Sequence, residues 1–365
     1  MPRSISAAVY TGESDRLEIV SLELADPQSG EVLIRMGASG VCGSDRHVVD
    51  GEWPMPTPTV LGHEGAGVVE AVGAGVTTVQ PGDHVILSWF APCQKCRSCA
   101  AGKSWACSRT RSVECVMPDG TTRHTMAGKQ VFPYLGLGTM AEYTVAPESA
   151  VVAIPREVPF DVASLIGCSV TTGVGAVLNN AAVTAGSSAV VIGCGGVGLS
   201  VIMGLALTGA HPIIAVDISR EKLDAAVRFG ATHTVVAGDT MVGDITAIVA
   251  DGADFTFEAI GRVESIEQLP NITRAGGTAV IVGLPPVGHR ATIDPLSFAE
   301  LGLTLVGSNY GGAVPLVDFP RIADLYLAGK LPLDELISDR VGLADANEAL
   351  DAMRRGERTR SVIVF

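Results

Sequence analysis

The sequence predicts an α/β protein of two parts, a β-rich part with a barrel-like core and a doubly wound parallel sheet. Up to about Ala150, short β-branched segments are separated by Gly/Pro turns such as Pro81-Gly82-Asp83. From about Thr171, apolar strand-length runs alternate with helical patterns. At 365 residues the chain is long enough for two domains, each with its own core.

The expected elements follow these patterns along the chain. In the first part we expect strands at residues 7–10, 17–20, 31–36, 67–72, 84–87 and 141–145, with long excursions at 40–58 and 91–134. In the second part we expect strands at 189–192, 213–216, 234–236, 255–258, 278–282 and 303–306. Two amphipathic helices (319–327 and 344–354) and a final strand (361–365) are expected to return to the first domain. The predicted domains are therefore 1–169 with 310–365, and 170–309.

A glycine motif lies between the first two strands of the predicted parallel sheet. Residues 193–198 read GCGGVG, and Asp217 ends the next strand. Gly193 permits a tight turn, Gly195 lets the backbone approach a pyrophosphate, and Gly198 allows close helix–strand packing. The helix N-terminus favours the diphosphate charge. Asp217 can accept hydrogen bonds from the adenosine ribose and repels a 2′-phosphate, so the motif predicts NAD rather than NADP.

Charge and hydropathy exclude other classes. The formal net charge is −14 and no basic run occurs, which argues against nucleic-acid binding. The first residues lack the apolar core of a signal peptide. Residues 162–216 contain no charged side chain, but polar residues interrupt every apolar run before it could cross a bilayer. We expect buried parallel strands with their covering helices, in a soluble, cytoplasmic protein without membrane or nucleic-acid partners.

Four of the eight cysteines are spaced as metal ligands. Cys93-x2-Cys96-x2-Cys99-x7-Cys107 lies in a polar loop, and four thiolates from one short segment can close a tetrahedron around zinc. Bacterial iron–sulfur ferredoxins place the fourth cysteine earlier, with proline after it. Here Ser108 follows Cys107. With all four positions filled, the predicted zinc site is structural.

Cys42, His63 and Cys168 could form a second set. Two thiolates and an imidazole leave zinc one open position, as in catalytic sites. Taken singly, however, a histidine is more often structural and a cysteine more often a small buried hydrophobe. Their spacing does not group them.

The chain resembles the zinc-dependent medium-chain alcohol dehydrogenases of the liver type from residue 33 to its end. The resemblance rests on Gly62-His63-Glu64, the four-cysteine loop, Gly167-Cys168, the glycine motif, residues 282–286 (VGLPP) and residues 359–365 (TRSVIVF). It implies a GroES-like β-barrel catalytic domain, a Rossmann coenzyme domain, and assembly as a homodimer or homotetramer.

The resemblance also implies roles for individual residues. It makes Cys42, His63 and Cys168 the ligands of a catalytic zinc, and Cys93, Cys96, Cys99 and Cys107 those of a structural zinc. Glu64 is implied beside the metal, Asp45 as the group that orients His63, and Ser44 with His47 as a proton relay. Trp89 and Tyr134 are implied as aromatic walls of the substrate pocket. The implied coenzyme contacts are Thr172, Gly193, Gly195, Gly196, Val197, Gly198, Asp217, Lys222, Val282, Leu284 and Arg360.

Two departures from the family pattern affect the expected function. Gly43 stands where many relatives carry a basic residue that pairs with the pyrophosphate, so NAD binding should weaken unless a residue such as Arg46 substitutes. Arg111 resembles the arginine of glutathione-dependent formaldehyde dehydrogenases, but Trp53 replaces its acidic partner. The pattern therefore does not favour a glutathione adduct as substrate.

The predicted function is zinc-dependent oxidation of an alcohol to an aldehyde or ketone, and the reverse, by hydride transfer to NAD. Trp89 and Tyr134 suggest an apolar or aromatic alcohol. Three alternatives remain: a nicotinoprotein that keeps NAD bound and uses a second carbonyl as acceptor, a relative recruited to non-redox chemistry, and a non-catalytic NAD-binding relative. The presence of all three catalytic zinc ligands argues against the last.

Overall fold

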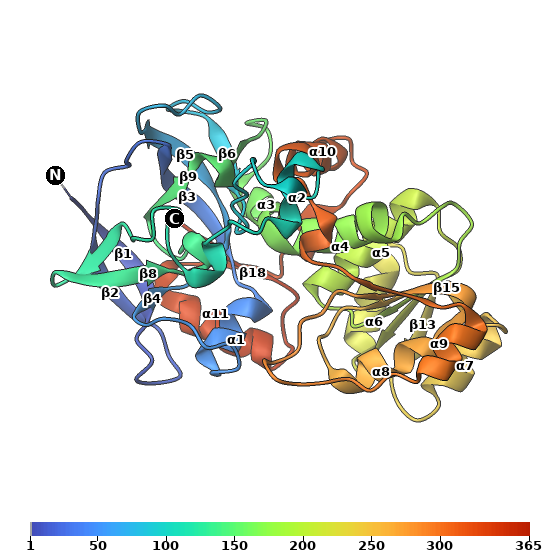
Figure 1. Cartoon of the computed structure of the whole chain (residues 1–365). Helices are drawn as coiled ribbons and strands as arrows, with labels where there is room; N and C mark the ends of the chain where they lie inside the picture. The colour runs from blue at the N-terminus through green and yellow to red at the C-terminus, as the bar shows by residue number, and fades with distance from the viewer. Residues whose placement is uncertain (1) are drawn as a thin grey trace. The chain divides into compact units, whose positions relative to one another are not determined.

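The computed structural model describes residues 2–365 and divides the chain into two compact units. The first unit consists of the chain through Ser169 together with Val314–Phe365, and the second of Val170–Ala313. Figure 1 follows the chain through both units.

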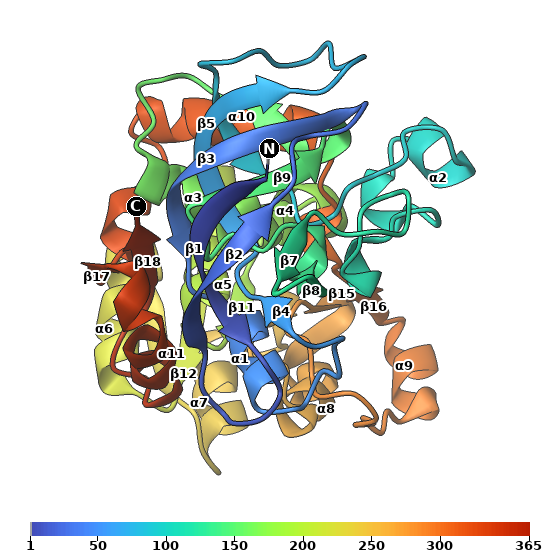
Figure 2. The same ribbon diagram turned by 90° about the vertical axis from the view of Figure 1, so that its left-hand side faces the viewer.

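The first unit contains a closed barrel and a seven-stranded sheet. The barrel order is β1 (Arg3–Tyr10), β2 (Glu18–Leu24), β7 (His124–Met126), β8 (Lys129–Pro133) and β4 (Thr59–Val60). The sheet order is β10 (Val151–Ala153), β6 (His84–Leu87), β5 (Glu64–Val72), β3 (Glu31–Gly40), β18 (Ser361–Val364) and β17 (Asp339–Val341), with β9 (Tyr143–Pro147) also paired to β3. Figure 2 shows the curved strands β1, β2, β3 and β5.

Strand β3 lies at the centre of this unit. It pairs antiparallel with β5, β9 and β18, and it is buried along most of its length. The C-terminal tail therefore lies in the first unit, because β18 supplies a strand next to β3. The helices of this unit are α1 (Gly43–Val49), α2 (Arg97–Ala100), α3 (Phe160–Leu165), α10 (Pro315–Leu327) and α11 (Ala346–Arg354).

The second unit is the predicted doubly wound parallel sheet. Its order is β13 (His233–Val236), β12 (Ile213–Asp217), β11 (Ala189–Ile192), β14 (Ala253–Glu258), β15 (Thr273–Ile281) and β16 (Thr304–Gly307). The order reverses between β11 and β14, and ligands bind at the carboxyl ends of strands beside such a switch point. The helices are α4 (Thr171–Gly175), α5 (Gly196–Thr208), α6 (Arg220–Arg228), α7 (Met241–Ile248), α8 (Val263–Ile272) and α9 (Pro295–Leu301).

One helical run is apolar and long enough to span a membrane by length and composition. It extends over Phe160–Ala181 and includes the π-helical segments Ile166–Val170 and Ala176–Ala181. Within its most apolar window, 83% of the residues are buried inside the structure. A core helix of a soluble protein has the same character.

A buried histidine in the barrel makes the stability of the first unit depend on pH. His124 on β7 is 1% exposed, and neither ring nitrogen has a hydrogen-bond partner among the described residues. Burial lowers the pKa of His124 to about 4, because the protonated ring would lose its hydration without gaining a partner.

We predict that His124 destabilises the fold as the pH falls from 6.5, its ordinary pKa, towards about 4. In that window the unfolded chain binds a proton that the folded chain excludes, so the free energy of unfolding rises with pH. The full effect is about 3 kcal/mol. His124→Leu should remove this part of the pH dependence, measured as urea midpoints at pH 7.5 and 5. The exposed His233 provides the control as His233→Gln. If the urea midpoint of His124→Leu fell between pH 7.5 and 5 by as much as that of the unchanged protein, this pH dependence would not belong to His124.

Candidate metal centres and active site

Four residues from distant segments meet in the first unit. One ligand atom each from Cys42, His63, Glu64 and Cys168 lies within 4.8 Å of the others, and all four residues belong to one buried cluster. Cys42 immediately precedes α1, His63 immediately precedes β5, Glu64 begins β5, and Cys168 lies in the π-helical segment after α3. The fold thus brings together three residues that the sequence pattern could not group.

The donor set of this cluster fits zinc. His63 Nε2 is buried without a hydrogen-bond partner, although buried polar atoms are nearly always paired. Cys42 and Cys168 offer sulfur beside that nitrogen, and zinc prefers such N/S ligands. The pKa of the Cys42 thiol is held well below its ordinary value, first by a hydrogen bond with Cys168 and against the effect of burial. The cluster therefore favours a thiolate, the form that binds metal.

Asp45 holds this cluster in place. Its carboxylate is fully buried and accepts the N–H groups of Cys42 and Gly62, both at 3.0 Å, while His63 Nδ1 lies 3.2 Å from Oδ1. Donation from Nδ1–H leaves Nε2 of His63 as the acceptor nitrogen. Burial lowers the pKa of His63, but the negative charges of Asp45 and Cys42 outweigh burial and raise it well above the ordinary value.

Glu64 lies in the cluster but has a cation of its own. Its carboxylate pairs with the Arg360 guanidinium and accepts the Ser169 N–H at 3.3 Å, while Oε2 has no partner among the described residues. Burial raises the pKa of Glu64 to about 7 although Arg360 opposes the shift. The structure therefore places Glu64 beside the three N/S donors.

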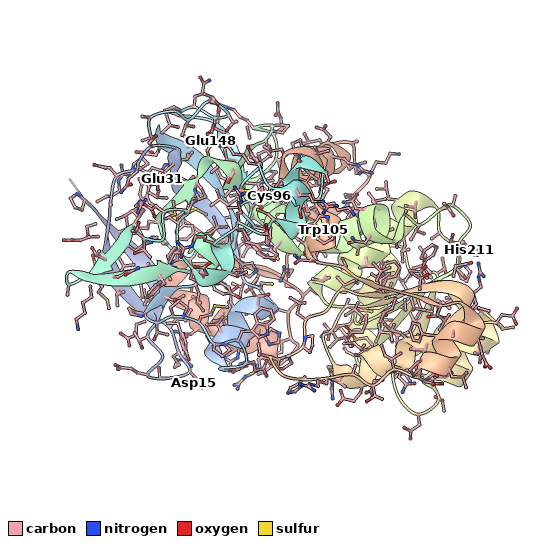
Figure 3. The ribbon with its side chains drawn as sticks, in the orientation of Figure 1. Asp15, Glu31, Cys96, Trp105, Glu148 and His211 are labelled. Carbon is pink, nitrogen blue, oxygen red and sulfur yellow. The ribbon has the colours of Figure 1, made fainter. Side chains whose placement is uncertain are left out.

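The four-cysteine loop forms the second cluster. Cys93, Cys96, Cys99 and Cys107 place their sulfur atoms within 4.8 Å of one another, and Cys96 is labelled in Figure 3. The Cys96 sulfur lies 3.5 Å from that of Cys99 and 3.9 Å from that of Cys107. A tetrahedral zinc with Zn–S bonds of about 2.3 Å has S···S edges of about 3.8 Å. Backbone N–H groups lower the pKa of Cys96 to about 6, which favours the thiolate.

The glycine motif has the backbone geometry predicted for it. Gly193 adopts a φ of +97°, open only to glycine without strain. A Cβ on Gly198 would lie 1.7 Å from the Gly193 carbonyl oxygen, so the helix packs closely on the strand. A Cβ on Gly195 would meet nothing within 4 Å. The backbone at Gly195, which caps the start of α5, is therefore open to a ligand.

Asp217 ends β12 beside this motif. Its carboxylate is 8% exposed and accepts the Cys194 N–H at 2.8 Å and the Ser219 N–H at 3.0 Å. These bonds fix the acid between the glycine turn and the start of α6, and its ribose contact stays a prediction.

The predicted relay residues lie on α1. Ser44 and His47 are three residues apart and so share one face of the helix. His47 Nδ1 pairs with the Glu52 carboxylate, and its ring stacks on Trp53 with centroids 4.5 Å apart. Glu52 was not among the site residues expected from the sequence.

Comparison with known proteins identifies the family. Residues 28–156 match the family model for the alcohol dehydrogenase GroES-like domain, and residues 196–327 match that for zinc-binding dehydrogenase. The chain is 40% identical over 374 residues to alcohol dehydrogenase class-3 of Cereibacter sphaeroides, covering 98% of this chain and 99% of that protein. The chain belongs to the zinc-dependent alcohol dehydrogenase family. It is an oxidoreductase with zinc and NAD as cofactors.

Two further relatives cover nearly the full length of this dehydrogenase or all of it. S-(hydroxymethyl)glutathione dehydrogenase of Paracoccus denitrificans is 39% identical over 372 residues, with 98% of this chain and 99% of that protein covered. The crystal structure of benzyl alcohol dehydrogenase from Acinetobacter calcoaceticus aligns with a TM-score of 0.94 and 33% identity, covering 100% of this chain and 99% of that one.

The aromatic residues predicted as pocket walls take different positions in the dehydrogenase. Tyr134 is fully buried, its hydroxyl donates to the Ser44 carbonyl at 3.1 Å, and its ring meets His63 edge-on at 5.4 Å. It packs against the ring of His63, and its pocket role stays a prediction. Trp89 is half-buried and packs against Phe90 with centroids 5.5 Å apart, and its pocket role stays a prediction.

Arg360 has partners within the first unit. It is 5% exposed, pairs with Glu64 and donates to the Val41 carbonyl at 3.1 Å, and its pyrophosphate contact stays a prediction. A buried carboxylate such as Glu64 requires a counter-charge. Arg46 cannot readily replace the basic residue missing at Gly43, because Asp50 and Asp351 hold its guanidinium. A Cβ on Gly43 would meet nothing within 4 Å, so that place is open.

The remaining coenzyme contacts stay predictions. Thr172 lies on α4, Val197 on α5 and Lys222 on α6. Val282 and Leu284 follow β15, the first buried and the second 55% exposed.

We predict two zinc ions per chain, one in each cluster. Cys168→Ala should lose one ion and lower turnover by at least about 100-fold, because the reacting metal loses a ligand, while the second ion stays bound. Cys115→Ala removes a buried thiol outside both clusters and should keep both ions and full activity. Metal analysis of purified protein tests this. Full activity with one ion per chain would refute the catalytic cluster.

Proposed function

We propose that this dehydrogenase oxidises primary alcohols with an apolar or aromatic substituent to aldehydes at the Cys42–His63–Cys168 site. The observation that carries the proposal is the buried, unpartnered Nε2 of His63 facing two thiols. The similarity to benzyl alcohol dehydrogenase over the full length of both chains supports the substrate class.

Cys42, His63 and Cys168 would hold the catalytic zinc. When bound there, zinc supplies a Lewis acid that lowers the pKa of an alcohol hydroxyl, and NAD supplies the carbon that accepts hydride. Asp45 keeps the His63 ring in one tautomer and orientation. Arg360 compensates the charge of Glu64, so the site does not accumulate unbalanced carboxylate charge.

Ser44 and His47 would move the proton. The Ser44 hydroxyl accepts the proton that leaves the substrate oxygen, and His47, one helical turn further along α1, carries it towards solvent. The side chain of His47 is 27% exposed, which gives the proton an exit.

We further propose that the first unit is the catalytic domain and the second the coenzyme domain, with boundaries close to 1–169 with 310–365 and 170–309. Both metal clusters lie in the first unit and the glycine motif lies in the second, which supports this division. Arg46 and Arg360 are both occupied and Gly43 offers no charge. Weak pyrophosphate binding would follow, and it favours exchangeable NAD over a nicotinoprotein.

We also propose that the protein forms a homodimer or homotetramer in a reducing compartment such as the cytoplasm. Strand β16 is an open sheet edge with Leu305 39% exposed, and Leu296 and Leu301 on α9 are 63% and 41% exposed. Such an edge favours pairing with a second chain. Within residues 2–365 all eight cysteines are unpaired, as expected where thiols stay reduced.

The closest competing substrate class is a glutathione adduct, because one relative is named S-(hydroxymethyl)glutathione dehydrogenase. In this chain Arg111 pairs with Glu114, with Nη2 2.5 Å from Oε2, and Trp53 stands where an acid would be its partner. We expect kcat/KM with NAD for benzyl alcohol to exceed that for formaldehyde with glutathione by at least about 10-fold, a difference of about 1.4 kcal/mol. A reversed order in a substrate panel would overturn the proposed substrate class.

Asp217 should set the preference for NAD. In the double variant Asp217→Gly, Ile218→Arg, the acid is removed and an arginine is placed at an 81%-exposed position beside it. The ratio of kcat/KM for NAD to that for NADP should fall by at least about 100-fold, because charge-assisted bonds move from ribose hydroxyls to phosphate. Asp224→Asn on α6 is the matched control and should leave the ratio unchanged. If both variants had the same ratio of kcat/KM for NAD to that for NADP, Asp217 would not be the residue that binds the ribose.

A further inference from the structure

At the C-terminal end of α1, the acid Glu52 contacts the relay histidine, His47. Gly51 has a φ of +71°, its N–H donates to the Val48 carbonyl at 3.1 Å, and the Glu52 N–H donates to the His47 carbonyl at 2.9 Å. These two bonds form a Schellman motif with Gly51 in the left-handed position. In this motif the residue after the glycine usually makes a hydrophobic contact with the helix one turn back. Here the contact at this place is polar, and it joins the Glu52 carboxylate to the His47 imidazole.

The contact fixes the imidazole of His47. Nδ1 pairs with the Glu52 carboxylate, and the ring lies on Trp53 with an interplanar angle of 19°. The Trp53 N–H also donates to the His47 carbonyl, at 3.1 Å, so the stack is anchored through the backbone. The ring is thus held by an acid at one edge and an indole on one face.

The pairing selects a tautomer. A carboxylate accepts hydrogen bonds, so the proton lies on Nδ1, and Nε2 is left with its lone pair. A base that receives a proton from Ser44 needs such a lone pair.

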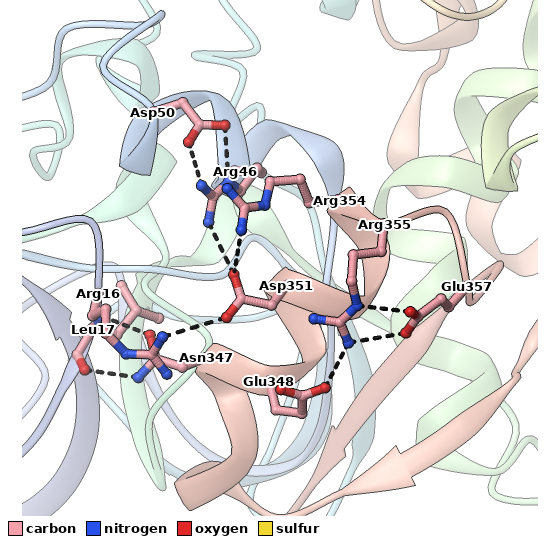
Figure 4. Close-up of polar contacts among 10 residues, drawn as sticks. All are labelled: Arg16, Leu17, Arg46, Asp50, Asn347, Glu348, Asp351, Arg354, Arg355 and Glu357. Atoms are coloured by element: carbon pink, nitrogen blue, oxygen red, sulfur yellow. Dashed lines mark hydrogen bonds and ion pairs between the residues drawn. The ribbon is translucent and has the colours of Figure 1, made fainter.

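The other charges near α1 are paired among themselves. Arg46 contacts Asp50 and also Asp351 of α11, as Figure 4 shows. Asp351 in turn contacts Arg16 and Arg354, while Arg355 pairs with Glu348 and Glu357. Among the described residues, Glu52 is the charged group that contacts the His47 ring itself.

We propose that Glu52 is a positioning residue of the proton relay. It holds His47 with the lone pair of Nε2 ready to accept a proton, and its carboxylate takes up the proton that leaves Nδ1. This inference rests on the proposed function. A proton arriving at Nε2 gives the imidazolium, and the Nδ1 proton then passes to the Glu52 carboxylate. From this 39%-exposed side chain it is released to water. One proton enters and one leaves, and no electrons are transferred in this step.

The test is a double-mutant cycle on alcohol oxidation. Glu52→Gln should lower kcat about 5-fold at pH 6–7 and change the acid limb of the pH–kcat profile, because His47 loses the carboxylate that fixes its tautomer and accepts its Nδ1 proton. His47→Gln should slow turnover more strongly, mainly at low pH, where hydroxide cannot replace the relay. In the His47→Gln background, Glu52→Gln should change kcat less than twofold, because Glu52 acts through His47. Glu52→Asp, which keeps the charge, should recover part of the loss.

Asp50→Asn is the matched control, since Asp50 belongs to the same turn but pairs with Arg46, and it should leave the profile in place. Nitrogen NMR of 15N-histidine-labelled protein adds a readout independent of activity and should find the His47 proton on Nδ1. A proton on Nε2, or additive losses in the cycle, would overturn the role of Glu52. If His47→Gln itself left the pH profile unaltered, the relay in the proposed function would fall first.

Discussion

The catalytic cluster depends on one buried carboxylate, that of Asp45. An ionised acid without exposure to water is tolerated only where hydrogen bonds satisfy it. Asp45 is satisfied by the N–H groups of Cys42 and Gly62 and by the ring of His63. The same bonds that stabilise the charge join the start of α1 to the start of β5. Two metal donors, Cys42 and His63, are therefore fixed by bonds within the protein. The ion pair of Glu64 with Arg360 joins the same cluster to the C-terminal tail.

The parallel sheet was predicted almost completely, and the barrel only in part. The strands around 189–192 and 213–216 are uninterrupted β-branched runs that are buried on both faces, so local composition determines them. Strands β7 and β8 lie in a polar excursion and begin with His124 and Lys129, whose residue types do not indicate a strand. They form because they pair with other strands of the folded barrel. The short helix α1 was missed because its residues GSDRHVV show no helical apolar period.

The site divides in the same way. The four-cysteine loop is local in sequence, and spacing alone predicted its cluster. Cys42, His63 and Cys168 come together only through the fold, so they could be grouped from the sequence only by family resemblance. Arg360 pairs with Glu64 and Tyr134 packs edge-on against His63, and these contacts join distant segments that the sequence pattern does not connect. Glu52 had a signal that could have been used: a helix-ending Gly51 places the next residue against the helix one turn back.

The central position of β18 has a consequence for how the protein is made. Strand β18, Ser361–Val364, comes after the whole parallel sheet in the chain, yet it pairs with β3, which comes before that sheet, and with β17. The parallel sheet can fold during synthesis, because it is complete at Ala313. The first unit cannot complete its seven-stranded sheet until β18 has also been made. A ribosome stalled in the final turn of α11 would carry a finished nucleotide-binding fold attached to an unfinished catalytic one.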